Sequence, residues 1–365
     1  MADIKSVVPA YIRAIQPYLP GKPISELARE LGLEDIIKLA SNENPRGPSP
    51  AALRAIQAAL PELTRYPDGN GFELKAALSA RFSLPNDWIV LGNGSNDLLE
   101  MASLVFLHPD ASAVYSQHAF AVYPLATQAR GATRIEVPAK AFGHDLAAMK
   151  AAIRPDTRIV FVANPNNPTG TWIDPAVLEA FIASIPEDVL VVLDEAYNEY
   201  LPAGHEMHSA AWVKRFTNLL VTRTFSKAYG LAALRVGYGL MRPEVADLMN
   251  RVRQPFNVNS LALAAAHAAL GDVDYLDASR RENAAGLKQL VAGFEKLGIA
   301  YIPSAGNFIC AKVGDAPKVY QALLRAGIIV RPVANYAMPE YLRITVGLPE
   351  ENARFLTALA GALAA

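Results

Sequence analysis

The sequence has little of what several large classes of protein need. Its single cysteine, Cys310, excludes a disulfide framework within one chain and fits a reducing compartment. The formal net charge is −1, and there is no basic run that would bind a nucleic-acid backbone or an acidic membrane surface. The longest apolar run, residues 261–270, is too short to span a membrane. We therefore expect a cytoplasmic protein with no nucleic-acid or membrane partner.

Motifs for metal, nucleotide and hydrolase chemistry are missing as well. The six histidines are scattered, and His205 and His208 have no third ligand near them in the sequence, so no metal site is expected. The glycine turn at residues 92–96 is followed by Asp97, where a dinucleotide-binding fingerprint needs a third glycine. The same turn lacks the Gly-Lys-Ser/Thr of a Walker loop, and no G-x-S-x-G elbow is present. These absences exclude the common nucleotide-binding and serine-hydrolase sites.

The apolar segments predict an α/β fold with two domains. A chain of 365 residues with 52% hydrophobic content can bury a large core. Nearly continuous apolar strands, such as residues 159–163, are typical of a sheet that is covered on both faces. From about residue 250 the pattern changes to helices followed by short strands, which predicts a second domain with a small mixed sheet. The helices expected there span residues 260–270, 275–297, 316–326 and 350–363, and the strands span 308–313, 328–331 and 341–346.

The most informative stretch is residues 221–240, which read VTRTFSKAYGLAALRVGYGL. A buried strand opens at Lys227 into a glycine-containing loop, where a lysine amine can be desolvated and become a nucleophile or Schiff-base former. Ser226 and Arg235 could bind a dianionic phosphate while Lys227 reacts with the same ligand. A solvated lysine at the end of a strand is the alternative interpretation. The combination of these residues favours a phosphate-bearing aldehyde as the ligand.

Three further segments supply polar groups at the ends of apolar strands. The glycine turn at residues 92–96 leads into a helix, whose free backbone N–H groups and positive dipole end can hold a phosphate. Residues 164–170, NPNNPTG, form a tight loop where open parallel sheets place their ligands. Asp194 ends another apolar strand and needs a cation or a strong donor there, unless it only caps the next helix. Arg343 lies within the apolar strand LRITVG and therefore needs an anion.

The motifs together resemble a known family. The pattern S-K-x-x-G-L-x-x-L-R-V-G-Y around Lys227 and the pattern N-P-x-N-P-T-G at residues 164–170 resemble the fold-type I aminotransferases that depend on pyridoxal 5′-phosphate (PLP). The resemblance implies a large domain with a mostly parallel central sheet flanked by helices, and a smaller α+β domain. We place these domains at residues 47–250 and 251–365. Residues 1–46 would form an arm that packs on the smaller domain or on a partner subunit.

The resemblance also assigns roles to individual residues. Lys227 would hold PLP as a Schiff base and then shuttle a proton, and Asp194 would keep the pyridine nitrogen protonated, so that the ring becomes an electron sink. Tyr197 would join Asn167 at the ring oxygen, so the expected catalytic residues are Lys227, Asp194 and Tyr197. Phe120 would stack on the ring face, although an aromatic residue there can equally be part of the core. The remaining expected cofactor contacts are Gly94, Ser95, Asn96, Thr224, Ser226 and Arg235.

One implied contact crosses a subunit boundary. In aminotransferases a tyrosine at the position of Tyr66 reaches the cofactor phosphate of the neighbouring subunit. This role predicts a homodimer. A tyrosine that is simply packed in a loop is the alternative interpretation.

The substrate is predicted from the same resemblance. Arg343 would bind the acidic group of the substrate, and Arg331, Tyr18 and Asn42 complete the expected substrate site. Residues 17–23, 42–45 and 66–68 resemble the histidinol-phosphate branch, which implies transamination between L-histidinol phosphate and 2-oxoglutarate in histidine biosynthesis. An aromatic (Phe/Tyr) amino-acid aminotransferase shares nearly every motif and is the main alternative. An amino-acid phosphate decarboxylase is a second one. A transcription regulator would need an attached DNA-binding module, which we do not expect here.

Overall fold

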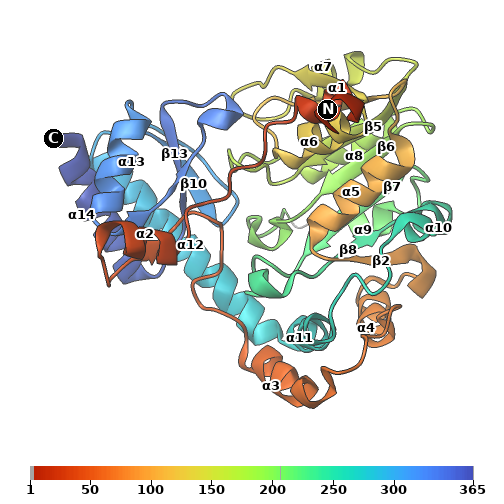
Figure 1. Ribbon diagram of the computed structural model, residues 1–365, viewed down its shortest axis with the longest axis horizontal. Coiled ribbons are helices and arrows are strands. Elements are labelled where there is room, and N and C mark those ends of the chain that lie inside the picture. Colours follow the sequence, from red (N-terminus) through yellow and green to blue (C-terminus); the bar gives the residue numbers. More distant parts are fainter. Residues whose placement is uncertain (1–3, 206, 365) are drawn as a thin grey trace.

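The computed structural model describes residues 4–205 and 207–364, and these residues form a sheet of seven strands, a sheet of four strands and a two-stranded sheet, with helices around them (Figure 1). The large sheet has seven strands in the order β2-β8-β7-β6-β5-β3-β4. Strand β8 runs antiparallel to β2 and β7, and the other neighbours pair in parallel. The predicted α/β fold with a mostly parallel sheet is therefore confirmed. The strands are β2 (Ile89–Gly92), β3 (Ser112–Ser116), β4 (Thr133–Val137), β5 (Thr157–Ala163), β6 (Leu190–Asp194), β7 (Leu219–Thr224) and β8 (Gly237–Leu240).

The central strands are continuously apolar because both faces of the sheet are buried. In β6, Val191 and Leu193 belong to one core cluster, whereas Leu190 and Val192 belong to the other. Successive side chains of a strand point to opposite faces, so each cluster needs its own cover of helices. Helices α5, α6 and α10 contribute residues to one cluster, and α3, α4, α8 and α11 contribute to the other. Because both faces of the sheet are apolar, polar groups that bind a ligand are expected at the carboxyl ends of the parallel strands.

The small sheet lies in the second half of the chain and is antiparallel throughout. Its order is β12-β13-β10-β9, and all three pairings are antiparallel, so the prediction of a mixed sheet is wrong. The strand expected at residues 328–331 is two strands, of which β11 pairs in parallel with β1 outside this sheet. Short apolar strands carry no sign of their direction, which explains the error. The bounds are β1 (Ile37–Lys38), β9 (Tyr301–Ile302), β10 (Phe308–Lys312), β11 (Ile328–Ile329), β12 (Arg331–Pro332) and β13 (Tyr341–Thr345).

The N-terminal arm runs between two parts of the molecule, the larger part around the seven-stranded sheet and the smaller part around the four-stranded sheet (Figure 1). Near its start, the Tyr11 carbonyl accepts a hydrogen bond of 3.0 Å from Gln128 Nε2 of α6, beside the large sheet. Further along, Leu27 of α2 packs against Leu324 and Ile329 of the smaller part. Helix α11 packs with the large sheet although the sequence prediction placed it beyond residue 250 in the second domain. The domain boundaries themselves stay predictions.

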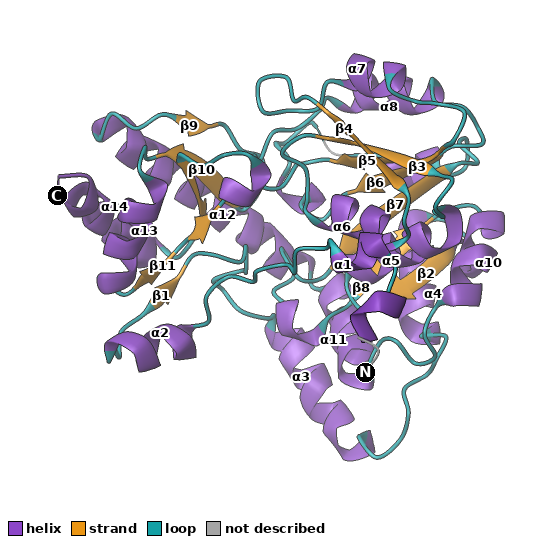
Figure 2. Cartoon of the chain, turned by 45° about the horizontal axis from the view of Figure 1, so that its top comes forward, coloured by secondary structure: helices purple, strands orange, loops and turns teal. Residues whose placement is uncertain are grey.

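Helices cover both sheets, as a second view shows (Figure 2). Among the described residues, no helix combines the length and the apolar character that a membrane crossing requires. The bounds are α1 (Ala10–Arg13), α2 (Ile24–Leu31), α3 (Pro50–Ala59), α4 (Phe72–Phe82), α5 (Ser95–Phe106), α6 (Val122–Ala129), α7 (Leu146–Ala151), α8 (Pro175–Ala183), α9 (Ser209–Trp212), α10 (Pro243–Val252), α11 (Ser260–Gly271), α12 (Val273–Lys296), α13 (Ala316–Arg325) and α14 (Pro349–Ala364).

Candidate active site

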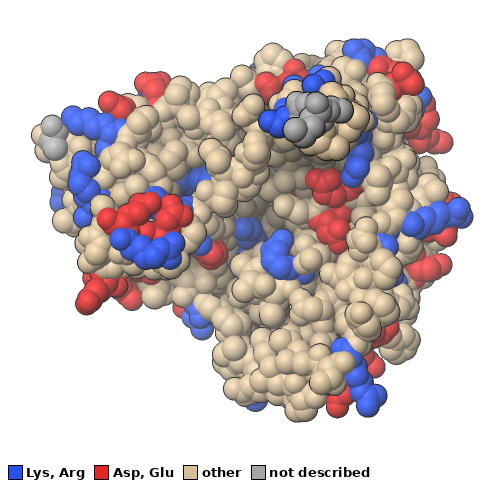
Figure 3. Space-filling model, viewed as in Figure 1, with Lys and Arg blue, Asp and Glu red and all other residues tan. Residues whose placement is uncertain are grey.

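A cavity of about 180 Å³ lies where the large sheet, the smaller part and the arm meet. In the space-filling view the molecule is hollowed between its two parts, and Lys and Arg atoms lie in the hollow (Figure 3). The predicted site residues line this cavity, with the exceptions of Gly94 and Tyr66. Those that line it are Tyr18, Asn42, Ser95, Asn96, Phe120, Asn167, Asp194, Tyr197, Thr224, Ser226, Lys227, Arg235, Arg331 and Arg343.

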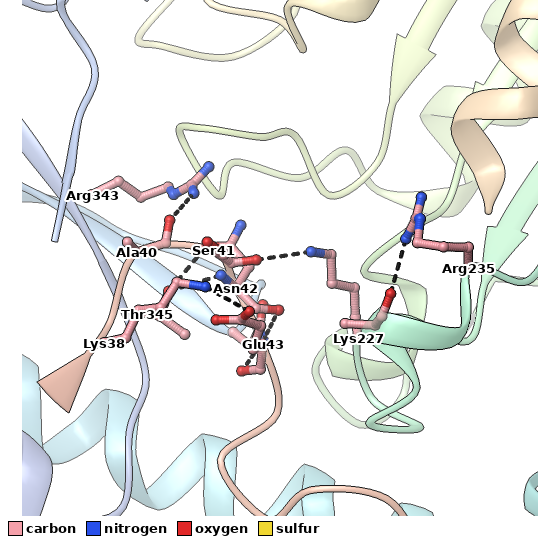
Figure 4. A network of polar contacts seen from close by, with 11 residues as sticks. Lys38, Ala40, Ser41, Asn42, Glu43, Lys227, Arg235, Arg343 and Thr345 are labelled. Atoms are coloured by element: carbon pink, nitrogen blue, oxygen red, sulfur yellow. Dashed lines mark hydrogen bonds and ion pairs between the residues drawn. The ribbon is translucent and has the colours of Figure 1, made fainter. Parts of the chain in front are cut away.

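Lys227 stands in the middle of the cavity, three residues after the end of β7. Its Nζ atom donates a hydrogen bond of 3.0 Å to the Ser41 carbonyl and lies 5.8 Å from the centre of the Tyr197 ring. Arg343 lies on one side of this amine and Arg235 on the other (Figure 4). Burial, followed by the positive charge of Arg343, lowers the pKa of the Lys227 amine to about 7. The amine is therefore substantially unprotonated at neutral pH and can act as a nucleophile.

Asp194 is the last residue of β6 and is buried. Its Oδ2 atom accepts a hydrogen bond of 2.8 Å from the Tyr123 hydroxyl. Its Oδ1 atom accepts weaker ones from the Ala196 backbone N–H at 3.2 Å and from the Thr222 hydroxyl at 3.3 Å. Burial raises the pKa of this carboxyl group, and these donors oppose the rise. The 3-10 helix that follows begins only at Asn198, so capping that helix does not account for Asp194.

One end of the cavity is built from the start of α5 and the turn after β7. Ser95 and Asn96 are the first residues of α5, where backbone N–H groups have no partner within the helix. Thr224 and Ser226 line the same end, and Arg235 Nη1 donates to Ser226 Oγ at 3.3 Å. Gly94 lies behind the arginine: a Cβ atom there would be 2.5 Å from Arg235 Nη2. The φ of +81° at Gly94 favours glycine, and the close approach of backbone and guanidinium forms a cradle for an anion.

The opposite end is built around Arg343 of β13. Arg343 Nη1 donates to Asn167 Oδ1 at 2.5 Å, and Nη2 donates to the Ala40 carbonyl at 2.7 Å. Within residues 4–205 and 207–364, Arg343 is buried and has no carboxylate partner, and its Nε atom has no hydrogen-bond partner. A buried guanidinium without a counter-ion is costly, so this end of the cavity favours an anionic ligand.

The other three predicted substrate residues, Arg331, Tyr18 and Asn42, line the same cavity. Arg331 Nη2 donates to the Leu19 carbonyl at 2.7 Å, and its guanidinium lies 5.4 Å from the centre of the Tyr18 ring. The arm thus covers this end of the cavity. Asn42 Nδ2 donates to the Tyr197 hydroxyl at 2.8 Å, so its side chain reaches the ring-oxygen group predicted from the sequence.

Comparison with known proteins decides the family. The profile described as aminotransferase class I and II matches residues 34–359 of the chain. The chain belongs to the aminotransferase class I and II family. A histidinol-phosphate aminotransferase of Nitrosospira multiformis is 60% identical over 99% of this chain and 93% of its own length. One of Pseudomonas aeruginosa is 59% identical over 100% of both chains.

A solved structure supports the assignment of this chain to the aminotransferases. The histidinol-phosphate aminotransferase of Sinorhizobium meliloti, crystallised with pyridoxal 5′-phosphate, has a TM-score of 0.90 and 29% sequence identity. The match covers 98% of each chain. The predicted PLP-dependent transferase fold of type I is therefore confirmed.

One predicted residue, Tyr66, lies away from this cavity. Tyr66 is 82% exposed and stacks on Phe256 at 4.7 Å, away from the cavity of its own chain. Its expected role across a subunit boundary stays a prediction. Among the described residues, no group of three His, Cys, Asp or Glu side chains is placed to hold a metal ion.

The sequence interpretation missed Tyr123 and Ser41, both of which line the cavity. Tyr123 lies three residues after Phe120, and this closeness in the sequence was the one available signal of its position. The Ser41 carbonyl is a backbone group, which residue types do not reveal. The sequence interpretation also missed the buried ion pair between Arg223 Nε and Glu195 Oε2, at 2.8 Å. Arg223 alternates with the site hydroxyls Thr222 and Thr224 and faces away from them into this pair.

Proposed function

We propose that this aminotransferase uses pyridoxal 5′-phosphate to move an amino group from L-histidinol phosphate to 2-oxoglutarate, giving imidazole acetol phosphate and glutamate in histidine biosynthesis. The observation that carries the proposal is one cavity with Lys227 between two separate anion sites. The cofactor and the substrate each bring one anionic group to such a site. Relatives about 60% identical over nearly their whole length are named histidinol-phosphate aminotransferases, which supports this donor.

The residues present fit the cofactor. The end formed by Ser95, Ser226 and Arg235 would hold its phosphate, because it combines a helix N-terminus, a hydroxyl and a guanidinium. Asp194, which lines the same cavity, would hold a proton on the ring nitrogen, since a buried carboxylate needs a cationic or donor partner. Phe120 would lie against the ring face. When bound, the cofactor supplies an electrophilic carbonyl and a ring that withdraws electrons from the substrate Cα.

Lys227 is the residue that we expect to move the proton at the substrate Cα. A group with a pKa near the working pH can both accept and return a proton, and the pKa of this amine is about 7. The Ser41 carbonyl and the Tyr197 ring restrict where the Nζ atom can lie. This restriction keeps the amine close to the place where a substrate held by Arg343 would present its Cα–H bond.

Arg343 has to accept two different acids in turn, a phosphate from the donor and a carboxylate from 2-oxoglutarate. A guanidinium fork matches both groups, whereas an ammonium would hold them only as a point charge. Asn167 Oδ1 fixes one arm of the fork, and the amide nitrogen of Asn167 then remains to donate toward the ring oxygen of the cofactor. The Tyr197 hydroxyl is held in place by the hydrogen bond that it accepts from Asn42 Nδ2.

We further propose that the chain works as a homodimer in which Tyr66 reaches the cofactor phosphate of the neighbouring subunit. The exposure of Tyr66 and its position outside the cavity of its own chain support this proposal. The cytoplasmic location inferred from the single cysteine stays a prediction.

A panel of amino donors with 2-oxoglutarate tests the proposed function. The wild type should convert L-histidinol phosphate, Lys227→Ala should lose activity by several orders of magnitude, and Lys312→Ala, a change at a partly exposed lysine of β10, should behave as wild type. Efficient transamination of phenylalanine or tyrosine without turnover of L-histidinol phosphate would replace the proposal with the aromatic alternative. Release of carbon dioxide without consumption of 2-oxoglutarate would indicate a decarboxylase.

A further inference from the structure

Tyr123 connects two of the predicted cofactor contacts. It is the second residue of α6 and is completely buried. Its hydroxyl donates to Asp194 Oδ2 at 2.8 Å. The Phe120 and Tyr123 rings are perpendicular, with a centroid distance of 5.9 Å and an angle of 89° between their planes. One side chain thus contacts both the carboxylate expected at the ring nitrogen and the aromatic ring expected at the ring face.

The Tyr123 ring is held firmly by its surroundings. It stacks on Phe161 of β5 at 4.7 Å, with only 7° between the ring planes. The Tyr123 carbonyl accepts a hydrogen bond of 2.7 Å from the Thr127 hydroxyl one turn later in α6. A tyrosine packed in this way delivers its hydroxyl to a fixed point, because the ring has little freedom to rotate.

Asp194 depends on such donors because no cation pairs with it among the residues that the structure describes. The Tyr123 hydroxyl makes the shortest of its hydrogen bonds. The other titratable groups around the pair are Glu195, Tyr197 and Tyr336. Glu195 pairs with Arg223 on the other side of the strand. None of these groups takes the place of the Tyr123 hydroxyl as a donor to Asp194 Oδ2.

We propose that Tyr123 is a positioning residue: its hydroxyl fixes and stabilises the ionised Asp194 carboxylate, and its perpendicular contact with the Phe120 ring sets the plane of Phe120. This inference rests on the proposed function and deepens it. A donor to the ionised form favours that form, so loss of the hydroxyl should make Asp194 easier to protonate. An Asp194 that is neutral or misdirected would hold the proton of the ring nitrogen less firmly, and the cofactor would bind more weakly.

The test compares Tyr123→Phe with Tyr115→Phe. Both remove one hydroxyl from a buried tyrosine in the same core cluster, but Tyr115 does not line the cavity. Infrared spectra of the purified proteins, recorded across pH and corrected with Asp194→Asn, follow the carboxyl group of residue 194. The Tyr123→Phe variant should protonate Asp194 at a pH higher by about one unit or more, and Tyr115→Phe should match the wild type.

Binding of PLP, followed by the absorbance of the cofactor, is the second measurement. The dissociation constant should rise about tenfold to about a hundredfold in Tyr123→Phe and should not change in Tyr115→Phe, as expected for one hydrogen bond to a charged group. Thermal melts check that each variant is folded. An unchanged Asp194 titration and unchanged cofactor affinity in folded Tyr123→Phe would overturn the inference. A wild type that binds no PLP would instead refute the proposed function, while the infrared titration would still decide whether Tyr123 controls Asp194.

Discussion

At the scale of single residues, the site is marked by buried basic side chains that have no carboxylate partner among the described residues. Lys227 is a buried amine between two guanidinium groups, and Arg343 is buried without a carboxylate partner in the described part of the chain. Each of these groups would be unfavourable in an empty protein interior. A cofactor with a phosphate and a carbonyl, together with an anionic substrate, compensates all of them. This complementarity accounts for the chemistry better than any one motif.

The first prediction concerns the pH dependence of Lys227. Only the unprotonated amine attacks a carbonyl, and the pKa of the Lys227 amine is lowered to about 7. The rate of reaction with an aldehyde should therefore be constant above about pH 7 and fall about tenfold per pH unit below it. Labelling at about pH 5 to about pH 9, with mass spectrometry of the peptide containing residue 227, measures the midpoint. Since the Arg343 charge contributes to the lowering, Arg343→Gln should move the midpoint upward. A midpoint near the ordinary lysine value in both proteins would contradict this account.

At the scale of elements, adjacent strands place charged residues on both sides of the large sheet. Asp194 lines the cavity and accepts a hydrogen bond from Thr222, whereas the next residues, Glu195 and Arg223, form a buried ion pair. The alternation of side chains along each strand separates the site from the structural pair. The sequence predicted Asp194 as a site residue, because a carboxylate at the end of an apolar strand is recognisable. The ion pair could not be predicted, since it depends on which strands become neighbours.

This arrangement predicts a large stability cost for Glu195→Gln. The change leaves the Arg223 guanidinium buried without its counter-ion, which should lower the free energy of unfolding by about 3 to 5 kcal/mol. The matched control is Asp247→Asn, which removes the exposed partner of Arg251 in a pair of similar length, 2.8 Å, and should cost less than about 1 kcal/mol. Urea denaturation of both variants measures the difference. Equal effects for the two variants would show that burial does not determine the value of the Glu195 pair.

At the scale of the whole molecule, the sequence predicted the architecture and most of the cavity lining, but not the way the parts join. The apolar strands predicted the parallel sheet, and residues 164–170 and Lys227 predicted where its ligand edge lies. The direction of the small strands and the pairing of β1 with β11 could not be predicted, because short strands do not encode their partners. Tyr123 was missed because a tyrosine in a helix is usually part of the core.

The predicted homodimer leads to a mixing experiment. Lys227→Ala and Tyr66→Ala homodimers should each be impaired, because the first lacks the amine and the second lacks the phosphate contact from the neighbour. A mixed dimer would contain one site with an intact Lys227 and an intact Tyr66 from the other chain. Mixing after partial unfolding and refolding should therefore restore activity to a fraction of the wild-type value. Activity that stays at the sum of the two variants, with dimers confirmed by sedimentation, would contradict the role of Tyr66.

The central claim is that one amine, Lys227 Nζ, binds the aldehyde of pyridoxal 5′-phosphate. Reduction of the purified protein with borohydride after addition of PLP, followed by peptide mapping, tests it most directly. We expect a pyridoxyl-phosphate group fixed to residue 227 in the wild type and no such group there in Lys227→Ala. A protein that does not turn yellow with PLP, or a label found only on other lysines, would contradict it.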